Sequence, residues 1–272
     1  MASTKREREL ARMRAQRQAA RRAALEAERR KRRATVLAGL SALAVAAVIV
    51  GIAVLTGGDD DDALSADPGA SASATSSTAA GACSYSTAGQ AAKPVSGLPS
   101  TKGPATKSDT KVVLTTSRGE VDLTLRGAKA PCTTNSFTFL AGQKYFDGTS
   151  CHRLTTAGIF VLQCGDPTGS GSGGPGYQFA DENLTGLGAP NTGGQVIYPR
   201  GTVAMANGGP GTNGSQFFLV YKDSPLAPKY TPFGTITKGL DVLDAIAKGG
   251  STPVNDGKPN LAITITTAKV QG

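Results

Sequence analysis

The side chains that most often carry out enzyme chemistry are scarce in this sequence. Its 272 residues include one histidine, His152, and four cysteines at positions 83, 132, 151 and 164. A zinc site built on histidine has no ligand set, because the cysteines are not paired at short spacing. A serine nucleophile lacks a Gly-x-Ser-x-Gly elbow, and a Ser-His-Asp triad would have to use His152. We therefore expect neither a cofactor nor a metal ion.

Two longer segments carry a more specific pattern. Residues 145–166 read YFDGTSCHRLTTAGIFVLQCGD, and residues 205–218 read MANGGPGTNGSQFF. Together they resemble the cyclophilins, the cyclosporin-binding class of peptidyl-prolyl cis–trans isomerases, and the second segment matches nearly residue for residue. The resemblance extends over roughly residues 110–270. It implies an enzyme that assists protein folding by accelerating rotation about X-Pro bonds.

Rotation about an X-Pro bond requires neither a nucleophile nor a metal ion, because no covalent bond breaks. The barrier of about 18–20 kcal/mol comes from amide resonance, and the unaided reaction takes roughly tens to hundreds of seconds. A fixed guanidinium can donate a hydrogen bond to the prolyl nitrogen as its lone pair localises in the twisted state. The resemblance implies that this donor is Arg153.

The resemblance also implies which residues hold the substrate. Apolar side chains would surround the proline ring, Gln163 would bond to a substrate carbonyl, and the backbone at Asn207 would hold the peptide in register. Gln216 would support Arg153 and Gln163. The full substrate-binding set implied in this way is Phe160, Val161, Gln163, Ala206, Asn207, Gln216, Phe218, Leu226 and Tyr230.

Other interpretations of these residues stay open at this point. Phe160 and Phe218 lie in strand-like runs and could be ordinary core residues, and Arg153 could be a surface residue of a strand. His152 fits a structural role better than a catalytic one. The chain could also be a proline-peptide-binding module with little catalysis, or an envelope-interaction protein whose N-terminal tail is the functional part.

Three features of the sequence, one insertion and two residues, depart from the family pattern. Two extra residues separate Arg153 from Phe160. Pro225 occupies the place where many relatives carry a drug-contacting tryptophan, and Tyr230 occupies the place of a pocket histidine. Since proline has no indole N–H and less area to stack, we expect weak cyclosporin binding.

The elements that would position these residues are mostly short strands. Residues 111–116 and 120–125 alternate around a turn and predict a hairpin, while residues 131–143 and 240–247 have helical spacing. Further apolar runs occur at 159–163, 201–206, 216–220, 231–236 and 261–267. Many short strands and two helices predict a closed β-barrel, and the resemblance implies eight antiparallel strands for residues 110–272.

The first 109 residues predict a different organisation. Residues 34–56 contain no charge, and a helix of that length, roughly 34 Å, can cross a bilayer core of about 30 Å. A cleaved signal peptide is the alternative, although its apolar region would be shorter. Residues 1–33 are basic, so we expect a cytoplasmic N-terminus and a single-pass anchor in the cell membrane. Residues 57–109, rich in Ala, Ser, Thr and Gly, predict a flexible extracytoplasmic linker.

The formal charge of +9 is confined to the basic tail. Residues 1–33 hold thirteen Lys and Arg against four Asp and Glu, whereas the rest of the chain balances to zero. The folded part therefore has no electrostatic reason to bind nucleic acid. Its expected partners are proline-containing polypeptides.

Four cysteines outside the membrane suggest two disulfides, with three possible connectivities. Cys151 comes shortly before Arg153 on one expected strand, and Cys164 directly follows Gln163 on the next. If these strands are antiparallel neighbours, Cβ atoms of opposite residues lie about 4.5–5.5 Å apart. That pairing would brace both strands. The remaining pair, Cys83 and Cys132, would join the linker to the first helix. Four free, buried thiols are the alternative.

Overall fold

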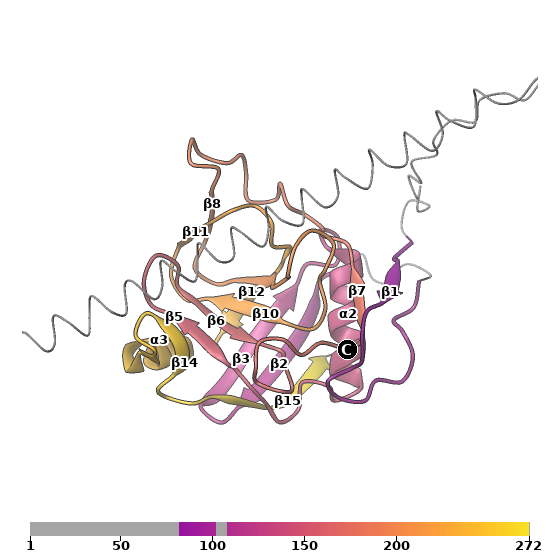
Figure 1. Ribbon diagram of the computed structural model, residues 1–272, viewed down its shortest axis with the longest axis horizontal. Coiled ribbons are helices and arrows are strands. Elements are labelled where there is room, and N and C mark those ends of the chain that lie inside the picture. Colours follow the sequence, from indigo (N-terminus) through magenta and orange to yellow (C-terminus); the bar gives the residue numbers. More distant parts are fainter. Residues whose placement is uncertain (1–81, 102–107, 272) are drawn as a thin grey trace, which may run out of the picture. The chain divides into compact units, whose positions relative to one another are not determined.

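The structure, a computed structural model, describes residues 82–101 and 108–271. Within these ranges the chain forms a strongly curled antiparallel sheet with two helices packed on it (Figure 1). The helices are α2 (Pro131–Gly142) and α3 (Leu240–Gly249). The strands are β1 (Tyr85–Thr87), β2 (Thr110–Thr116), β3 (Gly119–Leu125), β4 (Thr149–Ser150), β5 (Arg153–Thr155), β6 (Val161–Cys164), β7 (Tyr177–Phe179), β8 (Val196–Tyr198), β9 (Thr202–Met205), β10 (Phe217–Val220), β11 (Ser224–Leu226), β12 (Pro232–Lys238), β13 (Ser251–Thr252), β14 (Asp256–Pro259) and β15 (Thr264–Gln271).

The main sheet has eleven strands in the order β13-β14-β5-β6-β10-β9-β12-β3-β2-β15-β4. The prediction of a closed eight-stranded barrel is wrong, because the sheet curls into a half-barrel whose pairing ends at β13 and β4. The chain leaves one edge of the sheet and enters its interior between β4 and β5, which follow one another in sequence but are not paired. β4 pairs with β15 and β5 pairs with β6, while Cys151 and His152 between them belong to neither strand.

The predicted hairpin and both predicted helices are confirmed, with ends that differ by a few residues at most. β2 and β3 pair along their whole length, and Phe137 and Leu140 of α2 and Leu243 and Ile246 of α3 are buried.

Gly239, which precedes α3, has φ +88°, and a Cβ there would lie 2.2 Å from a backbone oxygen. Only glycine fits that approach of α3 to the β3 hairpin.

The neighbouring strands β5, β6 and β10 are covered by apolar side chains on both faces. Leu154, Leu162 and Phe217 project from the inner face into the main core beneath α2. Residues on the outer face, including Val161 and Phe218, form a second and smaller apolar cluster with β8. All four residues of β10 are buried for this reason, which explains its continuous FFLV sequence.

An ordered arm precedes the sheet, and it corrects the predicted extent of the linker. Residues 82–101, expected to be flexible, include β1, which pairs with β7. Tyr85 is buried and its hydroxyl donates to the carbonyl of Cys132 at 2.8 Å. The predicted disulfides are both present, Cys83–Cys132 and Cys151–Cys164. The Cys83–Cys132 pairing was predicted, but the low-complexity composition around Tyr85 gave no sign of the strand β1.

The predicted membrane segment, residues 34–56, lies outside the described residues, as do the basic tail and residues 57–81. Within ranges 82–101 and 108–271, no helix is long and apolar enough to cross a membrane. The anchor therefore stays a prediction from the sequence.

Candidate active site

One row of side chains crosses four neighbouring strands and contains the predicted catalytic residue. Arg153 on β5 is the Cα partner of Gln163 on β6, and Gln163 is the partner of Phe218 on β10. Phe218 is in turn paired with Ala204 on β9. Directly opposite residues of an antiparallel sheet project from the same face, so the guanidinium, the amide and the phenyl ring lie side by side.

A small cavity of about 150 Å³ lies on this outer face. Val161 and Phe218, both buried, make its base apolar. Eight of the ten catalytic and binding residues implied by the sequence line it, together with Ile159. The eight are Arg153, Val161, Gln163, Ala206, Asn207, Phe218, Leu226 and Tyr230.

Phe160 does not line this cavity, which corrects the expectation from the sequence. Ile159, Val161 and Gln163 occupy alternate positions on the cavity side, so Phe160 between them projects the other way. Its half-buried ring packs edge-on against Tyr221, with centroids 6.0 Å apart, and the ammonium of Lys222 lies 4.5 Å from its centre. Ile159 takes the pocket position.

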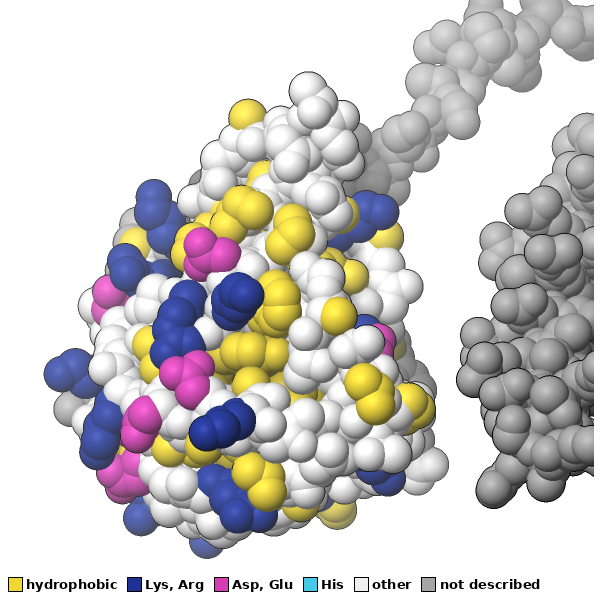
Figure 2. All heavy atoms as spheres, turned by 90° about the vertical axis from the view of Figure 1, so that its left-hand side faces the viewer, with side chains coloured by type: hydrophobic (Ala, Val, Ile, Leu, Met, Phe, Trp, Pro, Cys, Tyr) yellow, Lys and Arg dark blue, Asp and Glu magenta, His cyan; other side chains and the backbone are white. Residues whose placement is uncertain are grey.

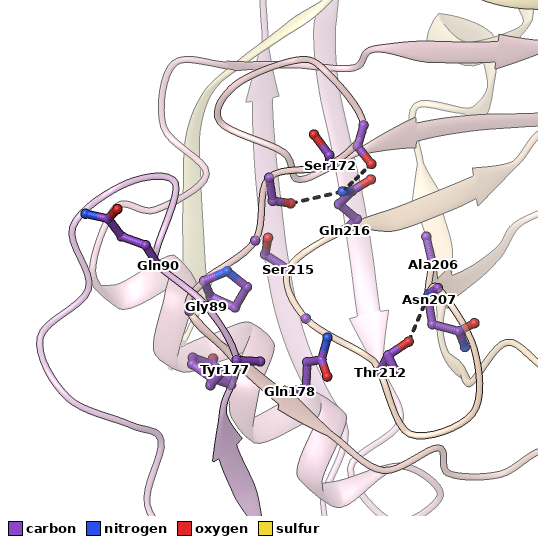
Figure 3. A pocket seen from close by; sticks show the side chains of 18 of the residues that line it. Gly89, Gln90, Ser172, Tyr177, Gln178, Ala206, Asn207, Thr212, Ser215 and Gln216 are labelled. Carbon is purple, nitrogen blue, oxygen red and sulfur yellow. Dashed lines mark hydrogen bonds between the residues drawn. The ribbon is translucent and has the colours of Figure 1, made fainter. Parts of the chain in front are cut away.

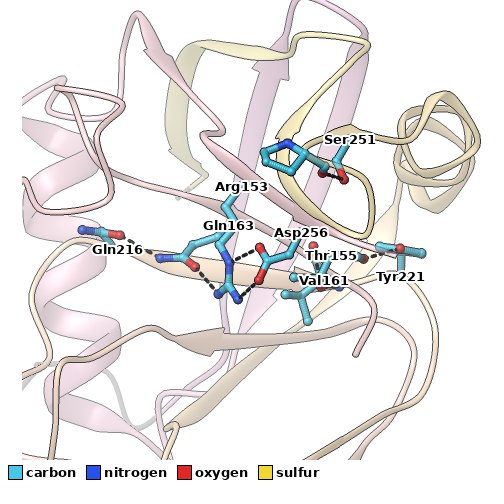
Figure 4. A network of polar contacts seen from close by, with 9 residues as sticks. Arg153, Thr155, Val161, Gln163, Gln216, Tyr221, Ser251 and Asp256 are labelled. Atoms are coloured by element: carbon cyan, nitrogen blue, oxygen red, sulfur yellow. Dashed lines mark hydrogen bonds and ion pairs between the residues drawn. The ribbon is translucent and has the colours of Figure 1, made fainter. Parts of the chain in front are cut away.

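Gln216 reaches the site through Gln163 instead of lining the small cavity. The side-chain amide of Gln163 donates to Oε1 of Gln216 at 2.8 Å, and its own Oε1 accepts from the guanidinium of Arg153 at 3.3 Å (Figure 4). The amide of Gln216 donates to the carbonyls of Gly171 and Gly173, each at 3.0 Å. The implied support of Arg153 and Gln163 by Gln216 is therefore a continuous chain of hydrogen bonds.

Besides Ile159, sequence reasoning missed Asp256, which holds the guanidinium of Arg153. Its carboxylate accepts two hydrogen bonds from Arg153, from Nε at 2.7 Å and from the second guanidinium nitrogen at 2.8 Å. Arg153 hydrogen-bonds this carboxyl and holds its pKa below the ordinary value, so it is ionised at neutral pH. This bidentate pair fixes the plane of the guanidinium. Asp256 is 103 positions away in sequence, and only the β14–β5 pairing brings it close.

A glycine- and serine-rich loop supports the far end of this chain of hydrogen bonds. Asp166, fully buried, accepts hydrogen bonds from the backbone of Thr168, Gly171 and Gly173 at 2.7, 2.7 and 3.1 Å. Burial acts to raise its pKa, but these bonds and one from the Thr168 hydroxyl outweigh it and lower the pKa to about 2. The carboxylate thus orders the loop whose carbonyls hold Gln216.

Asn207 and the segment after it are fixed by a second carboxylate, that of the half-buried Asp181. The side-chain amide of Asn207 donates to Asp181 at 3.2 Å and to the carbonyl of Lys229 at 2.8 Å. Asp181 also accepts from the amide of Asn213 at 2.9 Å and from the backbone of Gly211 at 2.8 Å. The rim of the cavity is therefore rigid at Asn207.

His152 is placed as a structural residue. Neither ring nitrogen is exposed, and neither has a hydrogen-bond partner among the described residues. Burial lowers the pKa of the imidazole, so it is neutral at pH 7. Its neighbour Cys151, which lies just before β5, forms the disulfide with Cys164 at the end of β6 and so ties together the segments that present Arg153 and Gln163.

The geometry of the cavity suits a substrate group that is apolar and uncharged. On the face drawn in Figure 2, acidic and basic side chains are interspersed, in keeping with the balanced charge beyond residue 33. No cluster of three His, Cys, Asp or Glu side chains that could hold a metal ion occurs in the described ranges. What the cavity offers is a hydrophobic base beside a fixed hydrogen-bond donor.

Several known proteins are similar to this chain in sequence or fold. A family model, "Cyclophilin type peptidyl-prolyl cis-trans isomerase/CLD", matches residues 111–270. A Mycobacterium tuberculosis protein named probable peptidyl-prolyl cis-trans isomerase B is 53% identical over 184 residues, 65% of this chain and 59% of that protein. Its Mycobacterium leprae namesake is 50% identical over 195 residues, 69% and 66% of the two chains.

A solved structure agrees with this description. The crystal structure of a Cryptosporidium parvum cyclophilin type peptidyl-prolyl cis-trans isomerase has a TM-score of 0.51 and 29% identity, and the match covers 61% of this chain and 99% of that one. The fold and the family model together define a cyclophilin. The chain belongs to the cyclophilin-type peptidyl-prolyl cis-trans isomerase family. It aligns with about 59% of the length of its Mycobacterium tuberculosis relative.

The buried carboxylate of Asp166 predicts a specific pH dependence of stability. Its folded pKa of about 2 lies below the ordinary value of 3.8, so its contribution is complete above about pH 5 and is lost as the pH falls toward 2. The difference in free energy of unfolding between the wild type and Asp166→Asn should therefore shrink by about 2 kcal/mol between pH 5 and pH 2.

Urea unfolding of the full chain at a series of pH values measures this difference. Asp109→Asn, at an exposed aspartate, reports the effect of removing one negative charge without removing these hydrogen bonds. A difference that stays constant for Asp166→Asn over the whole range would contradict the assignment.

Proposed function

We propose that this chain is a peptidyl-prolyl cis–trans isomerase that accelerates X-Pro rotation in polypeptides. The observation that carries the proposal is the row of Arg153, Gln163 and Phe218 beside the small apolar cavity. Relatives named peptidyl-prolyl cis-trans isomerase B support it, and so does a similar structure determined in the presence of the dipeptide Ala-Pro.

The proposed mechanism follows from what each side chain presents to the cavity. The proline ring packs on Phe218 and Val161, and Leu226 and Tyr230 close the sides. Asp256 and Gln163 together occupy three of the guanidinium N–H groups, and they aim those that remain on Arg153 toward the cavity. Donation to the prolyl nitrogen then stabilises the twisted amide, in which the lone pair is no longer delocalised.

Removal of the guanidinium tests catalysis directly. Arg153→Ala should lower kcat/KM for a proline peptide by about a hundredfold, equivalent to about 3 kcal/mol of transition-state stabilisation. Asp256→Asn should cause a smaller loss, about tenfold and mainly in kcat, because the guanidinium keeps its charge but loses its fixed plane. A protease-coupled peptide assay on the folded full-length variants measures both.

Arg126→Ala is the matched control, because Arg126 is exposed and, among the described residues, its side chain makes only a long ion pair with Asp109 at 4.0 Å. It should keep the wild-type rate. Near wild-type turnover by a folded Arg153→Ala variant would refute the mechanism. Tight proline-peptide binding by a wild type that does not accelerate rotation would establish the alternative, a binding module.

We further propose that the isomerase domain is extracytoplasmic and anchored by residues 34–56, with the N-terminus in the cytoplasm. The charge-free segment and the basic residues 1–33 support this orientation. Two disulfides in the described domain support an oxidising compartment. The proteins that fold there would be its substrates.

Protease treatment of intact cells tests this topology. The segment 57–81 contains no Lys or Arg, so a protease of broad specificity is needed instead of trypsin. We expect release of a soluble fragment that begins after residue 57 and retains the Cys83–Cys132 disulfide, while the basic tail stays protected. Loss of the basic tail from intact cells would contradict the proposed orientation.

We also propose that cyclosporin binds weakly. Pro225 lies on β11 next to Leu226 of the cavity and offers no indole to the drug. Pro225→Trp should strengthen binding about tenfold or more in calorimetry, whereas Pro228→Trp, outside the cavity lining, should not. Nanomolar affinity of the wild-type chain would contradict the proposal.

A further inference from the structure

A second and larger cavity, of about 590 Å³, opens directly beside the proposed proline site (Figure 3). Gln163, Ala206 and Asn207 line both cavities. An extended peptide advances roughly 3.3–3.6 Å per residue, so a chain with its proline in the small cavity places a nearby residue in the large one.

One wall of the large cavity comes from the arm that precedes the sheet. Figure 3 shows Gly89 and Gln90 of the arm on one side, with Ser172 and Asn207 on other sides of the space. The arm approaches the opposite loop closely. At Gly176, with φ +81°, a Cβ would lie 3.0 Å from the arm backbone, so glycine permits this contact.

The arm is held firmly enough to act as a wall. The backbone N–H of Ala88 donates to Gly176 at 2.9 Å, and that of Ala92 donates to Gly174 at 2.8 Å. The ammonium of Lys93 donates to three carbonyls after α2, at 2.7, 3.2 and 2.7 Å. At the other end, the disulfide from Cys83 ties the arm to the first turn of α2.

The chemistry of the lining restricts what it can accept. Glycines from three segments leave space, while the amides of Gln163, Gln178 and Asn207 and the hydroxyl of Thr212 offer hydrogen bonds. Among the described residues that line this cavity, none has a charged side chain. A charged substrate side chain would lose hydration there without gaining an ionic partner.

We propose that residues 82–93 of the arm are part of the substrate site and select an uncharged side chain within three residues of the proline. The inference rests on the proposed isomerase function and adds to it a determinant of sequence preference. The ligand is a small or polar uncharged side chain of the polypeptide substrate.

Charge substitutions at Gln90, an exposed residue of the arm, test this proposal. Full-length wild type, Gln90→Glu and Gln90→Lys are assayed on proline peptides that carry Ala, Lys or Glu at each of the three positions on either side of the proline. At one position the wild type should favour Ala. There, the ratio of kcat/KM for the Lys peptide to that for the Glu peptide should rise about fourfold in Gln90→Glu and fall about fourfold in Gln90→Lys.

Gln271→Glu and Gln271→Lys make the same chemical changes at the exposed end of β15 and should leave this ratio unchanged. Equal ratios in wild type and both Gln90 variants at every position would overturn the role of the arm, while turnover of the Ala peptides would leave the isomerase function standing. A wild type that accelerates none of the peptides would overturn the isomerase function itself.

Discussion

The strand register across β5, β6 and β10 is the constraint on which the rest of the site depends. It places Arg153 opposite Gln163 and Gln163 opposite Phe218, on the face away from the main core. A slip of one residue would turn all three side chains inward and bring core residues such as Leu162 to the outside. Burial of both faces and the Cys151–Cys164 disulfide oppose such a slip.

The register alone places the guanidinium, but its orientation depends on groups far away in the sequence. Asp256 bonds to one edge of the guanidinium and Gln163 bonds to another. Gln163 is in turn held by Gln216, which bonds to the loop ordered by Asp166. A donor already aligned needs little reorganisation when the substrate amide twists, which is why such preorganisation lowers a barrier. In the mechanism proposed above, the apolar cavity would strengthen the same hydrogen bond by excluding water.

Local patterns in the sequence predicted most of this arrangement. The hairpin and both helices follow from periodicity, and the two disulfides from cysteine placement. The eight residues of the cavity are those that the resemblance to the cyclophilins implied. Asp256 could not be found, because its role comes from the pairing of β14 with β5. The side on which Phe160 lies depends on how the altered loop before it enters β6. The arm was missed since its few large residues, Tyr85 among them, are surrounded by a composition typical of linkers.

In the proposed mechanism, a directed hydrogen bond from a fixed guanidinium, and not positive charge alone, drives the reaction. Arg153→Lys separates the two, because an ammonium keeps the charge but cannot bond to Asp256 as a fork while donating to Gln163 and the cavity. The measurement is kcat/KM of this folded variant in the peptide assay. We expect a value close to that of Arg153→Ala, about a hundredfold below wild type. Retention of most of the wild-type value would contradict it.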